Sequence, residues 1–407
     1  MQTIIDRYFF ILFIFTLIFG LLLYQIIGFL YMDECCALAL TGLFAYVLLQ
    51  TPDWRFNKAF LLTLGVFLFY TVYSFWIGSN SGRGIFNDLV IQMKPYLAFF
   101  CVYQLKPALN DSRRKLLRDV ILLFWTVLLL PVGVYALANE KILKVVFFQP
   151  AFYAINVTLL AICYLYCCDF SRRTKIIYLL LLSIGIVSGR SKFYGFFTLS
   201  VFMMFFFSNI AQFKLNARNV LLSIGMLASI IVVAWRKIAF YFYLGITNSG
   251  DFDKDMIARL VLYYYMPDIL LDYFPFGSGL ASYATSSSGE WYSHVYEKYG
   301  IDNVWGISKS YHSFISDTYY PSLAQFGVVG IALFLLFWVY LLRKTFLLYR
   351  ITGDIKSLIS VILIVGFLII ESTTNATFIS QGGLLAMMLL GLILSDMHKM
   401  PAVNRKP

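Results

Sequence analysis

Charged residues are scarce in this chain of 407 residues. Asp, Glu, Lys and Arg together make up 13% of it, about half their usual share in soluble globular proteins. Hydrophobic residues account for 60%, and the mean hydropathy is +0.78. A soluble fold of this length has too little interior to hide so much apolar surface. The composition therefore excludes an ordinary soluble domain and predicts a protein embedded in a lipid bilayer.

Several signatures of common enzymes are also missing. The chain has no Gly-rich phosphate loop, no His-Glu-x-x-His and no Gly-x-Ser-x-Gly. Its six cysteines all lie in or at the ends of apolar segments, which indicates small buried side chains rather than a disulfide framework. Cys163, Cys167 and Cys168 have no accompanying ligand cluster, so they do not indicate a metal site.

Long hydrophobic runs are the dominant feature that is present. A membrane-spanning helix needs about 20 mostly apolar residues. Twelve runs meet or approach this length, at 8–31, 34–50, 58–77, 88–105, 115–138, 151–168, 174–188, 192–210, 219–236, 321–342, 355–372 and 376–396. We therefore expect an all-α polytopic membrane protein with about 12 transmembrane helices.

The distribution of basic residues predicts the orientation of these spans. Cytoplasmic loops of membrane proteins are enriched in Lys and Arg. With the N-terminus in the cytoplasm, most basic residues fall on the cytoplasmic side, and Arg236 and Lys237 run against the trend. Both termini are therefore expected in the cytoplasm. The same bias explains the formal net charge of +11 without a nucleic-acid partner.

This topology divides the chain into four parts. Residues 1–236 hold spans 1–9, and 237–320 form one large polar loop with short helices outside the cytoplasm. Residues 321–396 hold spans 10–12, and 397–407 form a cytoplasmic tail. Loops longer than about 15 residues are usually functional. Within the large loop, 257–274 has an amphipathic pattern that predicts a helix.

Basic residues on the outer side are few, so each is informative. Arg190 and Lys192 lie in Ser-Gly-Arg-Ser-Lys, between spans 7 and 8. A guanidinium can hold a phosphate through two hydrogen bonds, and neighbouring helix ends add a favourable dipole. Arg83 and Lys94 flank the outer end of span 4, where a lysine inside a span needs a partner, water or a ligand. The alternative for each is a side chain that merely extends to the membrane interface.

The large loop holds the remaining candidates. Arg259 begins the amphipathic segment, which the run 275–279 would end in a tight turn. His312 lies shortly before span 10 and is the best general-base candidate on the outer face, because imidazole exchanges protons near neutral pH. A structural role is its alternative. His294 ranks lower, and Asp317 is the nearest acidic alternative for the base.

Asp251 and Asp253, with Asp255 after them, are carboxylates spaced like metal ligands in the loop. They could hold a divalent cation. Acidic residues also favour the N-terminus of a helix, and the predicted helix follows directly. We interpret them as a helix cap and predict no metal and no cofactor.

Together these features resemble the O-antigen polymerase/ligase superfamily of bacterial inner-membrane glycosyltransferases. The layout is similar, with twelve spans and a large periplasmic loop between the ninth and tenth. Ser-Gly-Arg-Ser at 188–191 resembles the arginine motif of that family, and Arg259 with Pro-Phe-Gly-Ser-Gly at 275–279 resembles its loop arginine and the element after it. Tyr-His-Ser at 311–313, followed by Phe-Gly-Val-Val-Gly at 326–330, resembles its histidine motif and helix start.

Two features depart from the pattern of the family. Ser313 stands where asparagine is usual, and the spacing from His312 to Gly327 is about one helical turn longer than expected. The second departure bears on the position of His312 more than on its identity.

The resemblance implies an activity. The donor would be a glycan on undecaprenyl diphosphate, and a hydroxyl of the acceptor would attack its anomeric carbon without a metal. His312 would accept the proton. The predicted diphosphate-binding residues are Arg190, Arg259, Lys94, Lys192 and Arg83.

The acceptor distinguishes two activities of the family. A polymerase of O-antigen or capsule repeat units uses another lipid-linked glycan, whereas a ligase uses lipid A core, in lipopolysaccharide assembly, or a protein. We favour the polymerase, because polymerases vary more in sequence. A transporter of lipid-linked oligosaccharides is the alternative from another class, although the chain shows no internal repeat.

Overall fold

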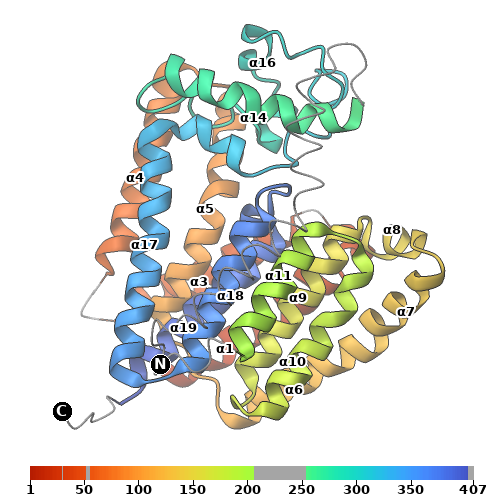
Figure 1. Ribbon diagram of the computed structural model, residues 1–407. Coiled ribbons are helices and arrows are strands. Elements are labelled where there is room, and N and C mark those ends of the chain that lie inside the picture. Colours follow the sequence, from red (N-terminus) through yellow and green to blue (C-terminus); the bar gives the residue numbers. More distant parts are fainter. Residues whose placement is uncertain (30, 52–55, 206–253, 402–407) are drawn as a thin grey trace, which may run out of the picture.

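The computed structural model describes the chain except for residues 30, 52–55, 206–253 and 402–407 (Figure 1). Every regular element in the described ranges is a helix. Eight of these helices are long and apolar enough to cross a membrane, so the prediction of a helical membrane protein is confirmed. The predicted span 219–236 and the aspartates Asp251 and Asp253 lie outside the described residues.

The helices of the first half, in chain order, are α1 (Gln2–Leu17), η1 (Ile18–Leu22), α2 (Tyr24–Ile27), α3 (Met32–Leu49), α4 (Lys58–Ile77), α5 (Gly82–Leu105), α6 (Asp111–Phe124), η2 (Trp125–Leu129), α7 (Leu130–Ala138), α8 (Lys141–Phe147), α9 (Pro150–Cys167), α10 (Arg172–Ser183), η3 (Ile184–Ser188) and α11 (Ser191–Phe205). Those of the second half are α14 (Lys254–Asp272), α15 (Ser286–Glu290), α16 (His294–Lys298), η6 (Tyr320–Phe326), α17 (Gly327–Thr352), α18 (Ile355–Glu371), η7 (Thr377–Ile379) and α19 (Gln381–Lys399).

Some boundaries differ from those predicted. The apolar run 8–31 is not one helix, because the chain leaves η1 at Leu22 and α2 ends at Gly28 in the left-handed conformation. The run 321–342 begins as the 3₁₀-helix η6 before α17 starts. Hydrophobicity reports which residues are apolar, whereas such breaks depend on local backbone conformation.

The helix bundle is built around α5, α9 and α19. Almost every residue of α9 and α19 is buried, whereas α4 and α7 keep many large apolar side chains exposed. Gly391 of α19 lies against the backbone of α5, where an added Cβ would be 2.7 Å from the Phe99 carbonyl oxygen. Small residues allow such close approach, which membrane bundles use for van der Waals packing.

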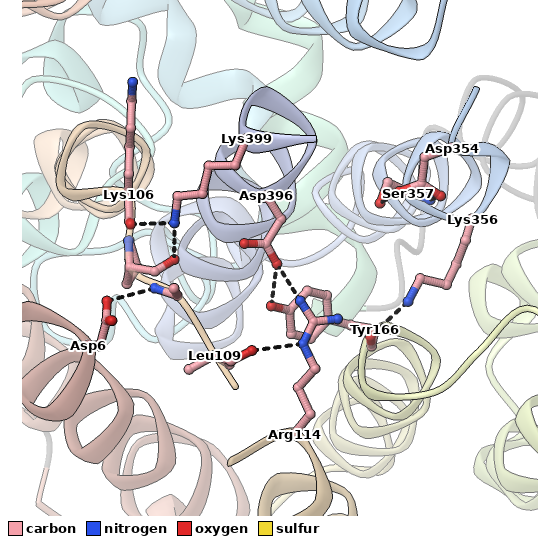
Figure 2. Close-up of polar contacts among 12 residues, drawn as sticks. Asp6, Lys106, Leu109, Arg114, Tyr166, Asp354, Lys356, Ser357, Asp396 and Lys399 are labelled. Atoms are coloured by element: carbon pink, nitrogen blue, oxygen red, sulfur yellow. Dashed lines mark hydrogen bonds and ion pairs between the residues drawn. The ribbon is translucent and has the colours of Figure 1, made fainter. Parts of the chain in front are cut away.

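A polar cluster fastens the helices at the end of the bundle where the N-terminus lies (Figure 2). Arg114 Nη2 and Tyr166 OH both donate to Asp396 Oδ2 at 2.8 Å. Lys356 Nζ donates to the carbonyl oxygens of Tyr166 and Cys168 at 3.1 and 2.9 Å. These contacts join α6, α9, α18 and α19.

The start of α1 and the end of α19 meet at the turn after α5. Lys399 Nζ, at the end of α19, donates to the Lys106 carbonyl oxygen at 2.6 Å. Gln2 Nε2, at the start of α1, donates to the same carbonyl at 3.1 Å. Asp6 Oδ1 accepts from the Ala108 amide at 2.8 Å. The start of α1 and the end of α19 therefore lie on the same side of the bundle.

Residues 254–320, which we call the cap, lie at the opposite end of the bundle (Figure 1). The predicted helix at 257–274 is present as α14. The cap has a hydrophobic core of its own, to which Leu262, Tyr283 and Tyr296 contribute. Lys298 and Tyr299 donate to Asp272 at 3.0 and 2.8 Å, and these hydrogen bonds hold the pKa of Asp272 below its usual range. The cap is thus a folded unit.

A crossing of two glycines joins the cap to the bundle. Gly277, after α14, has a φ of +81°, and Gly327, at the start of α17, has a φ of +63°. A Cβ on Gly277 would lie 2.2 Å from the Gly327 amide nitrogen, and the reverse distance would be 2.3 Å. Neither position has room for a side chain. The Pro- and Gly-rich segments 275–279 and 326–330 therefore pack directly against each other.

Side chains of α4 and α5 bind the backbone that follows this crossing. Tyr73 OH donates to the Gly277 carbonyl oxygen at 2.9 Å, and Ser74 Oγ accepts from the Leu280 amide at 2.8 Å. The fully buried Asp88 accepts from the Ala281 amide at 2.8 Å. These contacts fix how the cap is seated.

We predict that Gly277→Ala lowers the melting temperature far more than Gly300→Ala. Both positions have positive φ, which costs about 1–2 kcal/mol for a residue with a Cβ, but only Gly277 is crowded. Thermal unfolding of the purified variants, followed by size-exclusion chromatography, measures the difference. Equal shifts would show that the crossing is not tight.

Candidate anion-binding site between bundle and cap

Arg190 and Lys192 lie at the first turn of α11. Gly189 has a φ of +64° and ends η3, so the chain enters α11 almost at once. The Arg190 carbonyl oxygen accepts from the Phe193 and Tyr194 amides at 3.0 and 3.2 Å, as a residue at a helix start does. The N-terminus of a helix carries a partial positive charge. Two side-chain cations and this dipole therefore lie together.

Lys192 is partnered by a carboxylate from another helix. Its Nζ lies 2.5 Å from Glu371 Oε2, at the end of α18, and both side chains are largely buried. With the Asn375 amide oriented to satisfy its neighbours, its oxygen accepts from Lys192 Nζ at 2.6 Å. A buried ion pair needs such additional hydrogen bonds to offset its desolvation.

Arg259 brings a third cation from the cap. Its Nη2 and Nε donate to Asp317 Oδ2 at 2.5 and 3.1 Å. One turn further along α14, Tyr263 OH donates to the Thr373 carbonyl oxygen at 2.7 Å. This contact seats α14 on the turn that follows Glu371. The cap helix is therefore held beside the Lys192 pair.

The cap helix brings Arg259 to Arg190 and Lys192, although Arg259 lies far from them in the chain. Arg190 and Arg259 both lie close enough to Lys192 for their charges to act on it, and Arg190 also acts on Glu371. Glu371 pairs with Lys192, and Asp317 pairs with Arg259. The Arg259 side chain is 30% exposed and that of Lys192 is 12% exposed. The group can receive an anion at its arginine side.

Lys94 lies elsewhere, inside a separate buried cluster. Its Nζ contacts Asp33 Oδ2 and lies 2.6 Å from Glu34 Oε1, both at the start of α3. The Lys94 side chain is 3% exposed. Two carboxylates occupy this ammonium, so its contacts are those of an ion pair that joins α3 to α5.

Arg83 is exposed at the first turn of α5, and no ion pair or hydrogen bond joins its side chain to another described residue. The structure does not bring it to the three cations. Of the five cations predicted from the sequence, it brings together Arg190, Lys192 and Arg259.

His312 is exposed on the cap surface. Its ring packs against Gly289 of α15, where an added Cβ would lie 3.0 Å from His312 Cδ2. His312 precedes Asp317 by five residues, and Asp317 holds Arg259, so one short segment connects the imidazole with the cation group. Asp317, the alternative base, is engaged by that arginine. His294 is exposed at the start of α16.

Sequence reasoning named Asp317 but missed Glu371, the partner of Lys192, and it missed Asp33 and Glu34, the partners of Lys94. Glu371, at the end of an apolar run, was visible as an acidic residue at the membrane boundary, which usually has a partner. The same holds for Asp33 and Glu34. The pairing of each with its lysine depends on which helices are neighbours, and that information is absent from the sequence pattern.

No group of three or more His, Cys, Asp or Glu side chains within the described ranges is arranged to hold a metal ion. A scan against models of protein families finds no match for the chain. A search of curated proteins also finds none.

We predict that Lys192→Met and Glu371→Gln each destabilise the protein. Lys192→Met leaves Glu371 buried without a cation, at a cost of about 3–5 kcal/mol. The double variant should recover much of this loss, because no unpaired charge remains. Melting temperatures of the two single variants and the double variant test it, with Lys298→Met as the control for an exposed pair. Additive losses would contradict the coupling.

Proposed function

We propose that this protein is a membrane glycosyltransferase that moves a glycan from undecaprenyl diphosphate to an acceptor hydroxyl. Arg190, Lys192 and Arg259 bind the diphosphate. The observation that supports this is the position of the cap helix that carries Arg259, which is held beside the Lys192–Glu371 pair of the bundle, at the end of the bundle away from Gln2 and Lys399. A diphosphate at the membrane surface is the ligand of matching charge.

The proposed topology has twelve spans, with both termini in the cytoplasm and the cap in the periplasm of a bacterial inner membrane. The shorter helices α10 with η3, α11 and α18 join the eight long ones, and the remaining predicted span, 219–236, lies outside the described residues. Two observations support this orientation. The start of α1 and the end of α19 lie at one end of the bundle, and the cap lies at the opposite end.

The chemistry requires one bond exchange. A bond forms between the acceptor oxygen and the anomeric carbon, while the bond from that carbon to the diphosphate oxygen breaks. The leaving diphosphate gains negative charge, and the two arginines stabilise it through charged hydrogen bonds. His312 accepts the proton of the acceptor hydroxyl. No electron transfer is involved, and water or a product carries the proton away later.

The acceptor determines the type of enzyme. We favour a polymerase of O-antigen or capsule repeat units, in which the acceptor is a second lipid-linked glycan. Transfer to lipid A core or to a protein would make the enzyme a ligase. Incubation of the purified protein with a defined diphosphate-linked oligosaccharide distinguishes these, because only the polymerase lengthens the chain without another acceptor. A transporter would produce no new glycosidic bond.

We expect Arg190→Ala and Arg259→Ala to lower turnover by about tenfold or more. A hydrogen bond to a charged group contributes roughly 1.5–3 kcal/mol. Lysine should rescue either position poorly, because it cannot bind a phosphate through a planar fork. Turnover and donor binding are measured in parallel, with Arg118→Ala, an exposed arginine of α6, as the control. Near-normal turnover of a well-inserted Arg190→Ala would remove that residue from the site.

For His312→Ala we expect a loss of turnover of about 10²–10⁴-fold, the usual contribution of a positioned base. Donor binding should remain, unlike in the arginine variants. His294→Ala serves as the matched control, since that histidine is also exposed on the cap. If His312→Ala retains its rate and Asp317→Ala is inactive, the base is the aspartate.

A further inference from the structure

The surface of the cap beside His312 carries two exposed aromatic rings. Trp305 is 41% exposed and Tyr311 is 38% exposed. We propose that these two rings form a carbohydrate-binding platform that holds the acceptor glycan beside His312. The inference rests on the proposed function, and it identifies the acceptor as a saccharide that the protein binds through the face of a sugar ring.

The two rings lie together and are supported from one side. Their centroids are 4.7 Å apart with an interplanar angle of 31°. Phe314 packs against both, with centroids 5.3 Å from Trp305 and 6.0 Å from Tyr311. Phe314 is only partly buried, and it belongs to the margin of the cap core. The pair is therefore a continuous aromatic surface on a fixed base.

The backbone around the rings is built for this arrangement. Gly306 has a φ of +85°, and a Cβ there would lie 2.1 Å from Phe314 Cδ2, so only glycine leaves room for the supporting ring. The Phe314 amide donates to the Gly306 carbonyl oxygen at 3.0 Å. Ile307 and Ile315 are buried in the cap core and anchor the two segments of the loop there. A loop fixed in this way can present a preformed surface.

The platform has the mixed character of a sugar-binding surface. A pyranose ring has an apolar face of C–H groups and a rim of hydroxyls. Aromatic rings with a polar tip match both. Neither Trp305 nor Tyr311 hydrogen-bonds through its side chain to any described residue, so both polar tips are open to a ligand. Asn303, Lys309 and Ser310 are exposed around the rings and add further hydrogen-bonding groups.

The position relative to His312 fits an acceptor subsite. Tyr311 and His312 are consecutive, so their Cα atoms are about 3.8 Å apart. In the proposed subsite, a short oligosaccharide lies on the rings and presents a hydroxyl to the imidazole. Exposed Trp and Tyr also occur at membrane interfaces. Against that role, the rings stand among the polar residues Asn303, Lys309 and Ser310 rather than on an apolar helix face.

The first test measures binding without transfer. The full-length protein in lipid nanodiscs is titrated with soluble oligosaccharides of glucose, galactose, mannose, rhamnose or N-acetylglucosamine, while tryptophan fluorescence is followed. At least one should change the emission saturably, and Trp305→Ala should weaken its affinity by about threefold to tenfold. Trp76→Ala, which removes an exposed tryptophan of α4, should not. Absence of binding, or binding unchanged in Trp305→Ala, overturns the proposal.

The second test separates the platform from a membrane anchor. Nanodiscs with brominated lipid should quench Trp76, which is 82% exposed on a membrane-spanning helix. The difference between wild type and Trp305→Phe gives the signal of Trp305, which should escape quenching. Quenching of Trp305 equal to that of Trp76 would assign the rings to the lipid and overturn the proposal.

The third test uses transfer kinetics, and it separates failure of this inference from failure of the proposed function. Trp305→Ala should raise the acceptor KM and preserve kcat, whereas His312→Ala should lower kcat. Transfer with an unchanged KM in Trp305→Ala overturns the platform and leaves the function intact. Saccharide binding at Trp305 in a protein that forms no glycosidic bond would instead overturn the proposed function and leave the platform intact.

Discussion

The backbone crossing of Gly277 and Gly327 is the constraint on which the candidate site depends. It brings the end of α14 against the start of α17 with no side chain between them. Tyr73 OH donates to the Gly277 carbonyl oxygen and Ser74 Oγ accepts from the Leu280 amide, and these two hydrogen bonds fix the cap to α4. Arg259 belongs to the helix that this junction holds, and Arg190 belongs to the bundle. Under the proposed function, a wider crossing would move Arg259 away from the ligand that it shares with Arg190, because a charge interaction weakens with distance and with intervening water.

The partners of the charged side chains depend on how much water can reach them. Lys94 has two carboxylate partners and Lys192 has one with an amide, as an ionised group requires where water is scarce. Arg259, at the boundary, is paired but remains partly accessible. Side-chain exposure increases from Glu371 through Lys192 to Arg259. The buried Lys192–Glu371 pair therefore stabilises the fold, whereas the more exposed Arg259 can exchange partners.

Composition and hydrophobic runs were sufficient to predict an all-helical membrane protein, because the length and apolarity of a span are local properties. The helix at 257–274 was likewise readable from its pattern. The ion pairs of Lys94 and Lys192 were not, because Asp33 and Glu371 lie far from them along the chain and meet them only through helix packing. The break of the first run at Gly28 and the 3₁₀ start at Tyr320 depend on backbone conformations that hydrophobicity does not report. For His312, the sequence pattern supplied only a predicted residue type and a predicted side of the membrane, whereas its packing on Gly289 required the fold.

The pairing of Arg259 with Asp317 has a consequence for the order of events during turnover. Asp317 occupies the guanidinium that a diphosphate would use, and it lies in the same short segment as His312. An incoming anion that displaces this carboxylate also removes one tether of the segment that carries the imidazole. Occupancy of the donor site and the geometry of the acceptor site are then thermodynamically linked, and such linkage is reciprocal. Under the proposed function, a resting carboxylate of this kind would let the protein discriminate against water as an acceptor until its donor is in place.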